Sequence, residues 1–134
     1  MIIDTIILVD DDPLAILISK SLLQKSEVLN EGIQLHTFTK PQAALEYMQT
    51  FASVPNRSAV VLLDINMPVM DGFQLLAALE KSNTSAAFKV IMLTSSISLQ
   101  DKERAESFPS VVDYFSKPLD FNKIDFIRSL LKAG

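Results

Sequence analysis

Short apolar runs rich in branched side chains alternate with longer amphipathic stretches along this chain, and few folds accommodate that rhythm. Each run has five or six residues, as β-strands usually do, and each longer stretch has the period of an α-helix. Parallel strands need a crossover helix between them, so the pattern predicts an α/β fold with a parallel sheet covered on both faces. The predicted strands are residues 5–9, 33–38, 59–63, 89–93 and 112–116.

Helices are predicted in the stretches between these strands and after the last one. The first helix carries large apolar side chains at helical spacing, and it opens on a proline, which suits a first helical turn. This apolar stripe consists of Leu14, Leu17, Ile18 and Leu22. The predicted helices are residues 13–25, 41–51, 72–81, 101–107 and 120–131.

Length and composition restrict the class of protein. A chain of 134 residues fits one domain, residues 1–134, and 49% hydrophobic against 21% charged residues allows a packed core. The net charge of −4 leaves no basic surface for direct nucleic-acid binding. Cysteine is absent, which suits a reducing compartment, and no apolar run approaches the roughly 18 residues needed to span a membrane. We expect a cytoplasmic protein without membrane contact.

Polar side chains follow four of the five predicted strands. Asp10 and Asp11 follow the first strand, Asp64 the third, Thr94 the fourth and Lys117 the fifth. Ligands of parallel sheets bind at the carboxyl ends of the strands, near the point where the strand order reverses. If the first, third, fourth and fifth strands are neighbours, three carboxylates, a hydroxyl and an ammonium converge in one crevice.

Three clustered carboxylates need a compensating charge. Two carboxylates ~5 Å apart, at an effective dielectric constant near 20, repel each other by roughly 3 kcal/mol. An all-oxygen site of this kind suits Mg²⁺ or Mn²⁺, so Asp10, Asp11 and Asp64 are predicted to bind a divalent metal. The metal and a lysine would also offset the charge on a phosphoryl group while Asp64 attacks it in line.

Four motifs resemble the receiver domain of two-component response regulators, and the resemblance covers essentially the whole chain. In that family an acidic pair follows the first strand, the phospho-accepting aspartate ends the third, a Thr or Ser ends the fourth, and Lys-Pro follows the fifth. The matching segments are "LVDDDP" (8–13), "LLDINMPVMDG" (62–72), "MLTSS" (92–96) and "DYFSKPL" (113–119). All four occur in the family's order and spacing.

The resemblance implies a flavodoxin-like, doubly wound sheet of strand order 2-1-3-4-5, and it assigns roles at the metal site. It makes Asp64 the phospho-acceptor, Asp11 and Asp64 direct metal ligands, and Asp10 a ligand through water. Asn66 would offer its backbone carbonyl to the metal. Asn66 and Ser96 would lie beside the route of the hydrolytic water.

The same resemblance assigns the switch. Thr94 and Lys117 would bind phosphoryl oxygens, and Thr94 would couple the phosphoryl group to the switch aromatic Tyr114. It also implies a cis peptide bond between Lys117 and Pro118, which X-Pro bonds tolerate because their trans preference is small.

Taken as a family member, the chain is expected to act as a stand-alone response regulator. It would take a phosphoryl group from a histidine kinase or a histidine phosphotransfer protein and then alter its binding to a downstream protein. The expected output surface is the fourth helix, the fifth strand and the fifth helix, roughly residues 101–131. Its only catalysis would be Mg²⁺-dependent self-phosphorylation and autodephosphorylation.

Two other functions share some of these features. A phosphatase of the haloacid dehalogenase type also uses a nucleophilic Asp, Mg²⁺, a Thr or Ser and a Lys. It needs a second Asp two residues after the nucleophile, where this chain has Asn66, and its acidic pair does not precede the nucleophile. An unphosphorylated interaction module of the same fold usually loses acidic or lysine positions that this chain keeps.

Several polar residues near these motifs have ordinary structural explanations. Asp12 precedes Pro13 at a predicted helix start and is expected to be an N-cap. Asp71 before Gly72 is expected to serve the turn and the next helix cap. His36, in the second predicted strand, is expected to be a structural residue away from the crevice.

Overall fold

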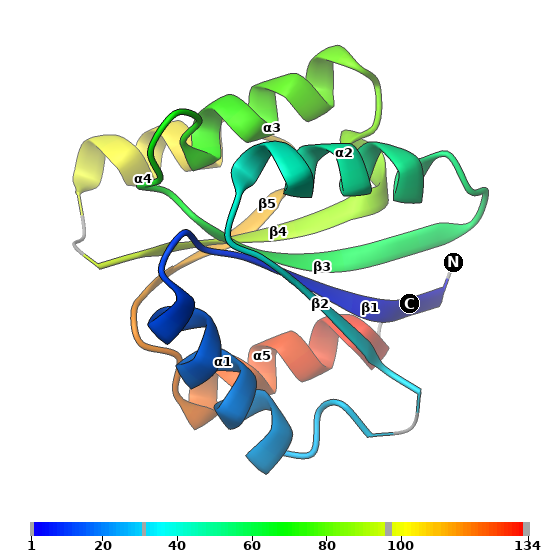
Figure 1. The fold of residues 1–134 in the computed structure, drawn as a ribbon, viewed down its shortest axis with the longest axis vertical. Coiled ribbons are helices and arrows are strands. Elements are labelled where there is room, and N and C mark those ends of the chain that lie inside the picture. The colour runs from blue at the N-terminus through cyan, green and yellow to red at the C-terminus, as the bar shows by residue number, and fades with distance from the viewer. Residues whose placement is uncertain (1, 31, 96–97, 133–134) are drawn as a thin grey trace.

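A computed structural model describes residues 2–30, 32–95 and 98–132 of the chain. Five parallel strands form one sheet of order β2-β1-β3-β4-β5, so the predicted fold class and strand order are confirmed. Figure 1 shows α1 and α5 on one face of this sheet and α2, α3 and α4 on the other. The strands are β1 (Ile2–Val9), β2 (Gln34–Phe38), β3 (Arg57–Asp64), β4 (Phe88–Thr94) and β5 (Val111–Ser116). The helices are α1 (Pro13–Lys25), α2 (Pro41–Ala52), α3 (Gly72–Lys81), α4 (Leu99–Glu106) and α5 (Phe121–Lys132).

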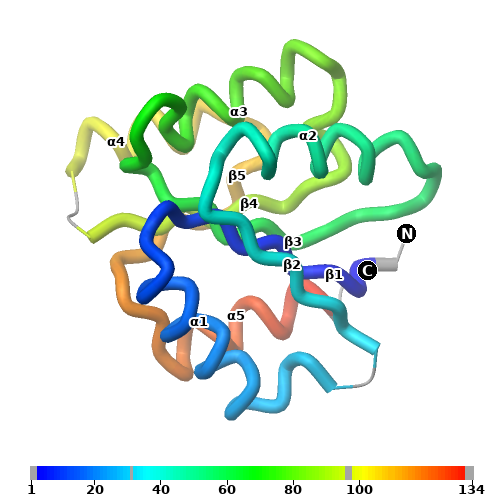
Figure 2. Tube along the Cα trace, in the orientation of Figure 1, coloured from blue at the N-terminus to red at the C-terminus, as the bar shows by residue number. Residues whose placement is uncertain are grey.

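Most element boundaries lie within two residues of the prediction, although β1 begins three residues earlier, and the chain trace in Figure 2 follows the predicted alternation. One short 3₁₀ turn, η1 (Ser85–Ala87), precedes β4 and was not predicted. Helix α4 begins earlier than expected because the Ser98 side chain caps it, accepting a hydrogen bond from the Asp101 N–H. Among the described helices, none combines the length and the apolar character that crossing a bilayer requires.

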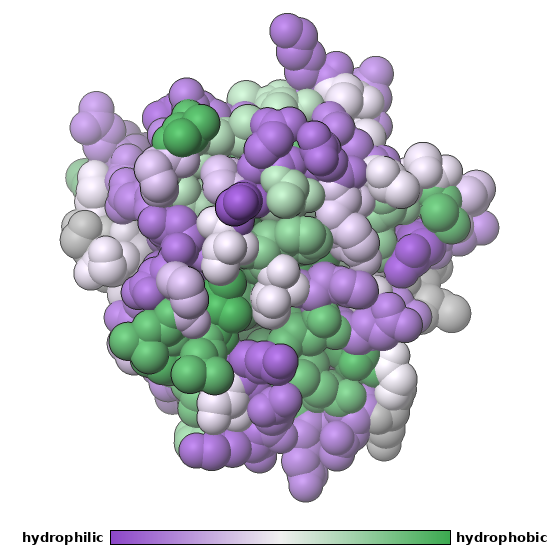
Figure 3. Space-filling view, in the orientation of Figure 1, coloured by the Kyte–Doolittle hydropathy of each residue, from purple (hydrophilic) through white to green (hydrophobic). Residues whose placement is uncertain are grey.

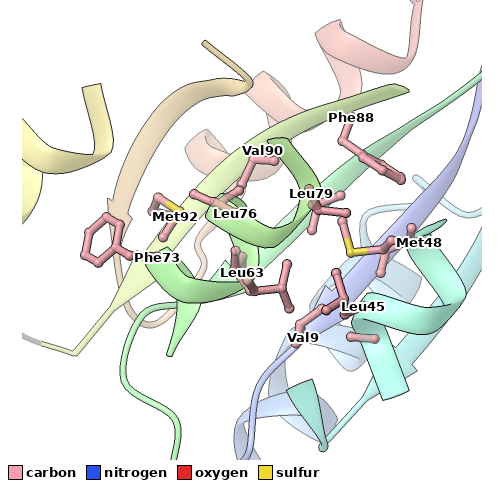
Figure 4. Packing of buried hydrophobic residues seen from close by; sticks show 14 of the residues in the cluster. Val9, Leu45, Met48, Leu63, Phe73, Leu76, Leu79, Phe88, Val90 and Met92 are labelled. Carbon is pink, nitrogen blue, oxygen red and sulfur yellow. The ribbon is translucent and has the colours of Figure 1, made fainter. Parts of the chain in front are cut away.

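The core lies on both faces of the sheet, and β3 contributes to each side. Its alternate residues point in opposite directions, so Val61 and Leu63 pack toward α2 and α3, whereas Val60 and Leu62 pack toward α1 and α5. Figure 4 shows Leu63 between side chains of α2 and α3. Every residue of β3 after Arg57 is buried. The strand that carries the candidate acceptor is therefore packed against helices on both faces of the sheet.

Helix α1 buries a different face from the one that its apolar stripe suggested. Leu14 and Leu17 are each 61% exposed and Ile18 is 44% exposed, whereas Ser19 and Leu23 are buried. Figure 3 shows apolar side chains gathered over α1 on the surface of the molecule. Of the predicted stripe, only Leu22 packs partly against the core, and the part formed by Leu14, Leu17 and Ile18 is left exposed.

The two predicted helix caps are confirmed. The Asp12 side chain accepts from the Leu14 N–H at 3.0 Å. Asp71 and Gln74 form a capping box, in which each side chain accepts from the other residue's N–H at 2.8 Å. Gly72 donates its N–H to the Ile65 carbonyl at 2.8 Å, and a Cβ there would lie 2.6 Å from the Asp64 carbonyl oxygen. Helix α3 thus starts in close contact with the acceptor's backbone.

His36 lies on the edge strand β2, where its ring contacts α2. Its ring centroid is 4.9 Å from that of Tyr47, and its Nε2 lies 3.4 Å from Oε1 of Gln34. This packing accounts for the residue structurally.

Candidate functional site

The strand register brings the polar strand ends to one edge of the sheet. Val9 of β1 pairs with Leu63 of β3, and Asp64 pairs with Leu93 of β4. Asp10, the first residue after β1, therefore follows a position directly beside β3. The central place of β3 between β1 and β4 puts Asp64 in the middle of this edge.

Three carboxylates meet there. One oxygen from each of Asp10, Asp11 and Asp64 lies within 4.8 Å of the other two. Asp10 is 2% and Asp64 4% exposed, and Asp11 is half-buried. The donor set is all oxygen and anionic, which fits a hard divalent cation such as Mg²⁺.

Lys117 supplies a positive charge to the same cluster. Its Nζ donates to Oδ2 of Asp10 at 2.6 Å and forms an ion pair with Oδ1 of Asp64 at 3.2 Å. The strand end is held by the Lys117 N–H, which donates to the Thr94 carbonyl at 2.7 Å. The Lys117–Pro118 peptide bond is cis, as predicted. From the sequence, Lys117 was expected to bind phosphoryl oxygens. The sequence did not reveal that its side chain bridges two of the carboxylates, Asp10 and Asp64.

The environment shifts the proton affinities of both partners. Burial raises the pKa of Asp64 to about 6, with a further increase from the Asp10 charge, and the opposing effect of Lys117 is smaller. Burial lowers the pKa of Lys117, but its hydrogen bond to Asp10 and the charges of Asp64 and Asp10 outweigh burial, so this pKa lies above its ordinary value. The lysine therefore stays charged beside a carboxyl that is harder to ionise than usual.

The remaining predicted residues lie around this centre. Thr94 is fully buried at the end of β4. Asn66, two residues past Asp64, has an exposed side chain. Tyr114 pairs with Met92 across β4 and β5, and its ring packs against the core cluster on the α2 and α3 side. Ser96 lies outside the described residues.

A cavity of about 240 Å³ adjoins the acidic cluster. Asp10 and Lys117 line it from the site, Leu14 and Ile18 line it from α1, and Leu119 from the segment before α5. The exposed apolar face of α1 is therefore continuous with the polar centre.

The structure is a doubly wound parallel sheet with three clustered aspartates and a bridging lysine at its carboxyl edge. This arrangement defines a class of α/β domain whose carboxylates could bind a divalent cation. Within that class, the chain belongs to the response regulator receiver domain family, whose profile matches residues 6–127. It is thus a receiver domain of the two-component type.

Individual relatives agree with this assignment. The chain is 35% identical over 130 residues to the heme response regulator HssR of Staphylococcus epidermidis, covering 94% of this chain and 50% of that protein. It spans about half the length of the curated relatives it matches. A response regulator receiver protein from Dyadobacter fermentans has a TM-score of 0.76 at 28% identity, covering 96% of this chain and 95% of the other. A two-component response regulator from Cytophaga hutchinsonii has a TM-score of 0.84 at 22% identity over the full length of both chains, which supports the fold.

Proposed function

We propose that this receiver domain accepts a phosphoryl group on Asp64 from the phosphohistidine of a histidine kinase or a histidine phosphotransfer protein. The observation that carries the proposal is the position of Asp64, which is 4% exposed, shares a site with two other aspartates and is paired with Lys117. The absence of cysteine and a net charge of −4 suit a cytoplasmic protein that acts on other proteins rather than on nucleic acid.

The hydrogen bonds favour Asp64 over Asp10 as the nucleophile. Both oxygens of Asp10 already accept hydrogen bonds, Oδ1 from the Asp12 N–H at 3.0 Å and Oδ2 from Lys117 at 2.6 Å. The contact of Asp64 with Lys117 is longer, at 3.2 Å. An Asp64 oxygen can attack the phosphorus atom in line, so that a P–O bond forms, the P–N bond to the donor's imidazole breaks, and the imidazole leaves.

The other side chains of the site act on charge. Asp10, Asp11 and Asp64, with the Asn66 carbonyl, would hold Mg²⁺, or Mn²⁺ in its place, and such an ion would supply positive charge to offset that of the phosphoryl oxygens. The Lys117 ammonium lies close enough to Asp64 to move from Asp10 to a new phosphoryl oxygen. Thr94, at the end of the neighbouring strand, would offer its hydroxyl to a phosphoryl oxygen.

The proposed response runs through Tyr114 to a downstream protein partner on α4, β5 and α5. The Tyr114 hydroxyl is buried and has no hydrogen-bond partner among the described residues. Leaving a buried hydroxyl unpaired costs about 1–3 kcal/mol, so the inward ring position is held at a cost. An outward position would release that cost, and a phosphoryl group that moves Thr94 can shift the balance between the two.

Acetyl phosphate with Mg²⁺ tests the chemistry without a partner protein. We expect intact-mass measurement to show one labile phosphoryl group on the wild type and none on Asp64→Asn. Asp71→Asn is the matched control, because asparagine also caps a helix and Asp71 belongs to the α3 capping box. A phosphoryl group that persists on Asp64→Asn would refute the assignment of the acceptor.

We further propose that the chain does not turn over external phosphomonoesters. Asn66 occupies the place where a dehalogenase-type phosphatase needs a general acid, and an amide cannot supply that proton. Repeated hydrolysis of p-nitrophenyl phosphate that is lost in Asp64→Asn would contradict this.

A further inference from the structure

Lys123, in the first turn of α5, contacts the backbone on both sides of Lys117. Its Nζ donates to the Ser116 carbonyl at 2.6 Å and to the Pro118 carbonyl at 3.1 Å. These two carbonyls belong to the residues directly before and after Lys117. Figure 1 shows the chain passing through this segment from β5 into α5. Hydrogen bonds from a charged donor are stronger than neutral ones, so this ammonium can hold the segment in one position.

The chemistry of the helix start does not account for a lysine at this position. Asp120 caps α5, because its Oδ1 accepts from the Lys123 N–H at 2.9 Å, and Lys123 is the third residue of the helix. A cation there faces the positive end of the helix dipole, and glutamate or glutamine is preferred because it completes a capping box. The equivalent position of α3 has Gln74, which completes such a box with Asp71. The Lys123 side chain serves the two carbonyls instead.

The ion pair of Lys123 is weaker than its contacts with the backbone. Its Nζ lies 3.7 Å from Oδ2 of Asp120, and that carboxylate side chain is 56% exposed. A long ion pair with an exposed partner contributes little to stability. The Lys123 side chain is only 22% exposed, so the ammonium lies mainly against the peptide groups around Lys117.

The end of β5 has little other packing to fix it. Each residue of β5 is at least partly exposed, and the first residue after it, Lys117, donates its N–H to the Thr94 carbonyl at 2.7 Å. Three hydrogen bonds therefore fix the backbone around Lys117, one from its own N–H and two from Lys123.

The position of this backbone decides where the Lys117 ammonium can reach. Its Nζ lies 2.6 Å from Oδ2 of Asp10 and 3.2 Å from Oδ1 of Asp64. A lysine ammonium is a point charge on a flexible stem, so its partners and its backbone together place it. In the proposed reaction the partners change, because the ammonium moves to a phosphoryl oxygen. The contacts of Lys123 with the backbone are outside that exchange and can persist through it.

We infer that Lys123 is a positioning residue for phosphoryl transfer, an inference that rests on the proposed function. It holds the backbone of Lys117 so that the ammonium can leave Asp10 for a phosphoryl oxygen on Asp64. Lys123 acts through Lys117 and not on the reacting atoms. Its effect on the rate should therefore disappear when the Lys117 ammonium is absent.

A double-mutant cycle tests this dependence. Lys123→Gln removes the ammonium and gives α5 the residue that completes the capping box of α3, so the helix start keeps a stabilising contact. We expect it to lower the rate constant of labelling by acetyl phosphate with Mg²⁺ about tenfold, since a misplacement of about 1 Å can cost about 100-fold. In the Lys117→Ala background the same substitution should change the rate constant by about twofold or less.

Two further variants and a second ligand support the cycle. Lys123→Arg should keep most of the rate, because a guanidinium can also donate to two carbonyls. Lys20→Gln, at an exposed lysine of α1, removes the same charge elsewhere and should leave the rate unchanged. The four proteins of the cycle are also titrated with beryllofluoride in Mg²⁺. Its affinity should follow the same pattern, even where labelling of Lys117→Ala is slow.

Urea denaturation separates positioning from folding. Lys123→Gln should keep the urea midpoint of the wild type while its labelling rate falls. An unchanged rate in Lys123→Gln, an equal fall in both backgrounds, or a fall that Lys123→Arg shares would each overturn the inference. A wild type that acetyl phosphate fails to label would instead refute the proposed function itself.

Discussion

Strands β3 and β5 end at the same edge of the sheet, but the protein holds them very differently. All residues of β3 after Arg57 are buried, whereas each residue of β5, Val111–Ser116, is at least partly exposed. The first strand carries the candidate acceptor Asp64 and the second carries Tyr114. The proposed chemistry, which depends on atomic positions, would thus take place on the fully packed strand, and the candidate switch lies on a strand with little buried surface.

The helices beside these strands repeat the contrast. Helix α3, which follows the acceptor, buries Gly72, Phe73, Leu75, Leu76 and Leu79. Helix α4, beside β5, buries only Ala105, although Arg104 also lies 4.4 Å from the Phe73 ring centroid. We therefore expect a small free-energy change to displace α4 and β5 more readily than α3 and β3.

The largest expected effect comes from truncating one apolar side chain in each strand. Leu63 is fully buried and Val112 is 41% exposed. We expect Leu63→Ala to lower the free energy of unfolding by about 4 kcal/mol, because it leaves a cavity in the core. Val112→Ala should change it by about 0.5 kcal/mol or less. Urea denaturation measures both, and similar losses at the two positions would break the contrast between the strands.

A second prediction concerns the charge on the rigid strand. The folded-state pKa of Asp64 is raised to about 6, above its unfolded value of about 4, so the folded protein keeps a proton that the unfolded chain releases. Without metal, the free energy of unfolding should therefore fall by roughly 2–3 kcal/mol as the pH rises from about 4 to above 6. Asp64→Asn should remove this dependence and be at least as stable as the wild type above pH 6.

Mg²⁺ provides the control for that experiment. If it binds the ionised carboxylates as proposed, it should restore the stability of the wild type at pH 7 and do much less for Asp64→Asn. Asp71→Asn, which keeps its helix cap, should follow the wild type in both conditions. Equal pH profiles for wild type and Asp64→Asn would show that Asp64 is not the group that titrates.

Much of this contrast could be predicted from the sequence, because strands and their polar ends follow from local patterns. The uninterrupted apolar run before Asp64 identified a buried strand, and the strand ends located Asp10 and Lys117. The pattern could not tell which face of α1 is covered, since spacing places Leu14 and Leu17 together without showing what packs on them. It also could not reveal the lysine bridge, which depends on how a long, flexible side chain lies between two carboxylates that are far apart in the sequence.

Val69 shows the same limit at the level of the backbone. Positive φ is usually predicted from glycine or asparagine, and the sequence has valine at this position. Its conformation is set by its neighbours. A hydrogen bond between Pro68 and Met70 closes the turn, and the capping box of α3 fixes Asp71, two residues after Val69. The α/β class was therefore predictable from periodicity and the strand order from the family resemblance, whereas the strained turn and the lysine bridge required the three-dimensional structure.

The smallest expected effect tests β5, the less buried of the two strands. Tyr114→Phe removes a buried hydroxyl that has no partner among the described residues, so it should raise the free energy of unfolding by about 1 kcal/mol. The ring of phenylalanine has no polar group to return to water, so the variant should also favour the inward position.

Beryllofluoride with Mg²⁺ mimics the phosphoryl group, and in the wild type we expect its amide NMR shifts to spread from the site into β5 and α4. In Tyr114→Phe the shifts in β5 should be smaller, because phenylalanine holds the ring inward whether or not the mimic is bound. Tyr47→Phe, on α2, serves as the matched control and should leave the response in β5 unchanged. If Tyr114→Phe destabilises the protein and the mimic still shifts β5 as in the wild type, the buried hydroxyl has no part in the switch, and the readout must run through another residue of the α4 and β5 surface.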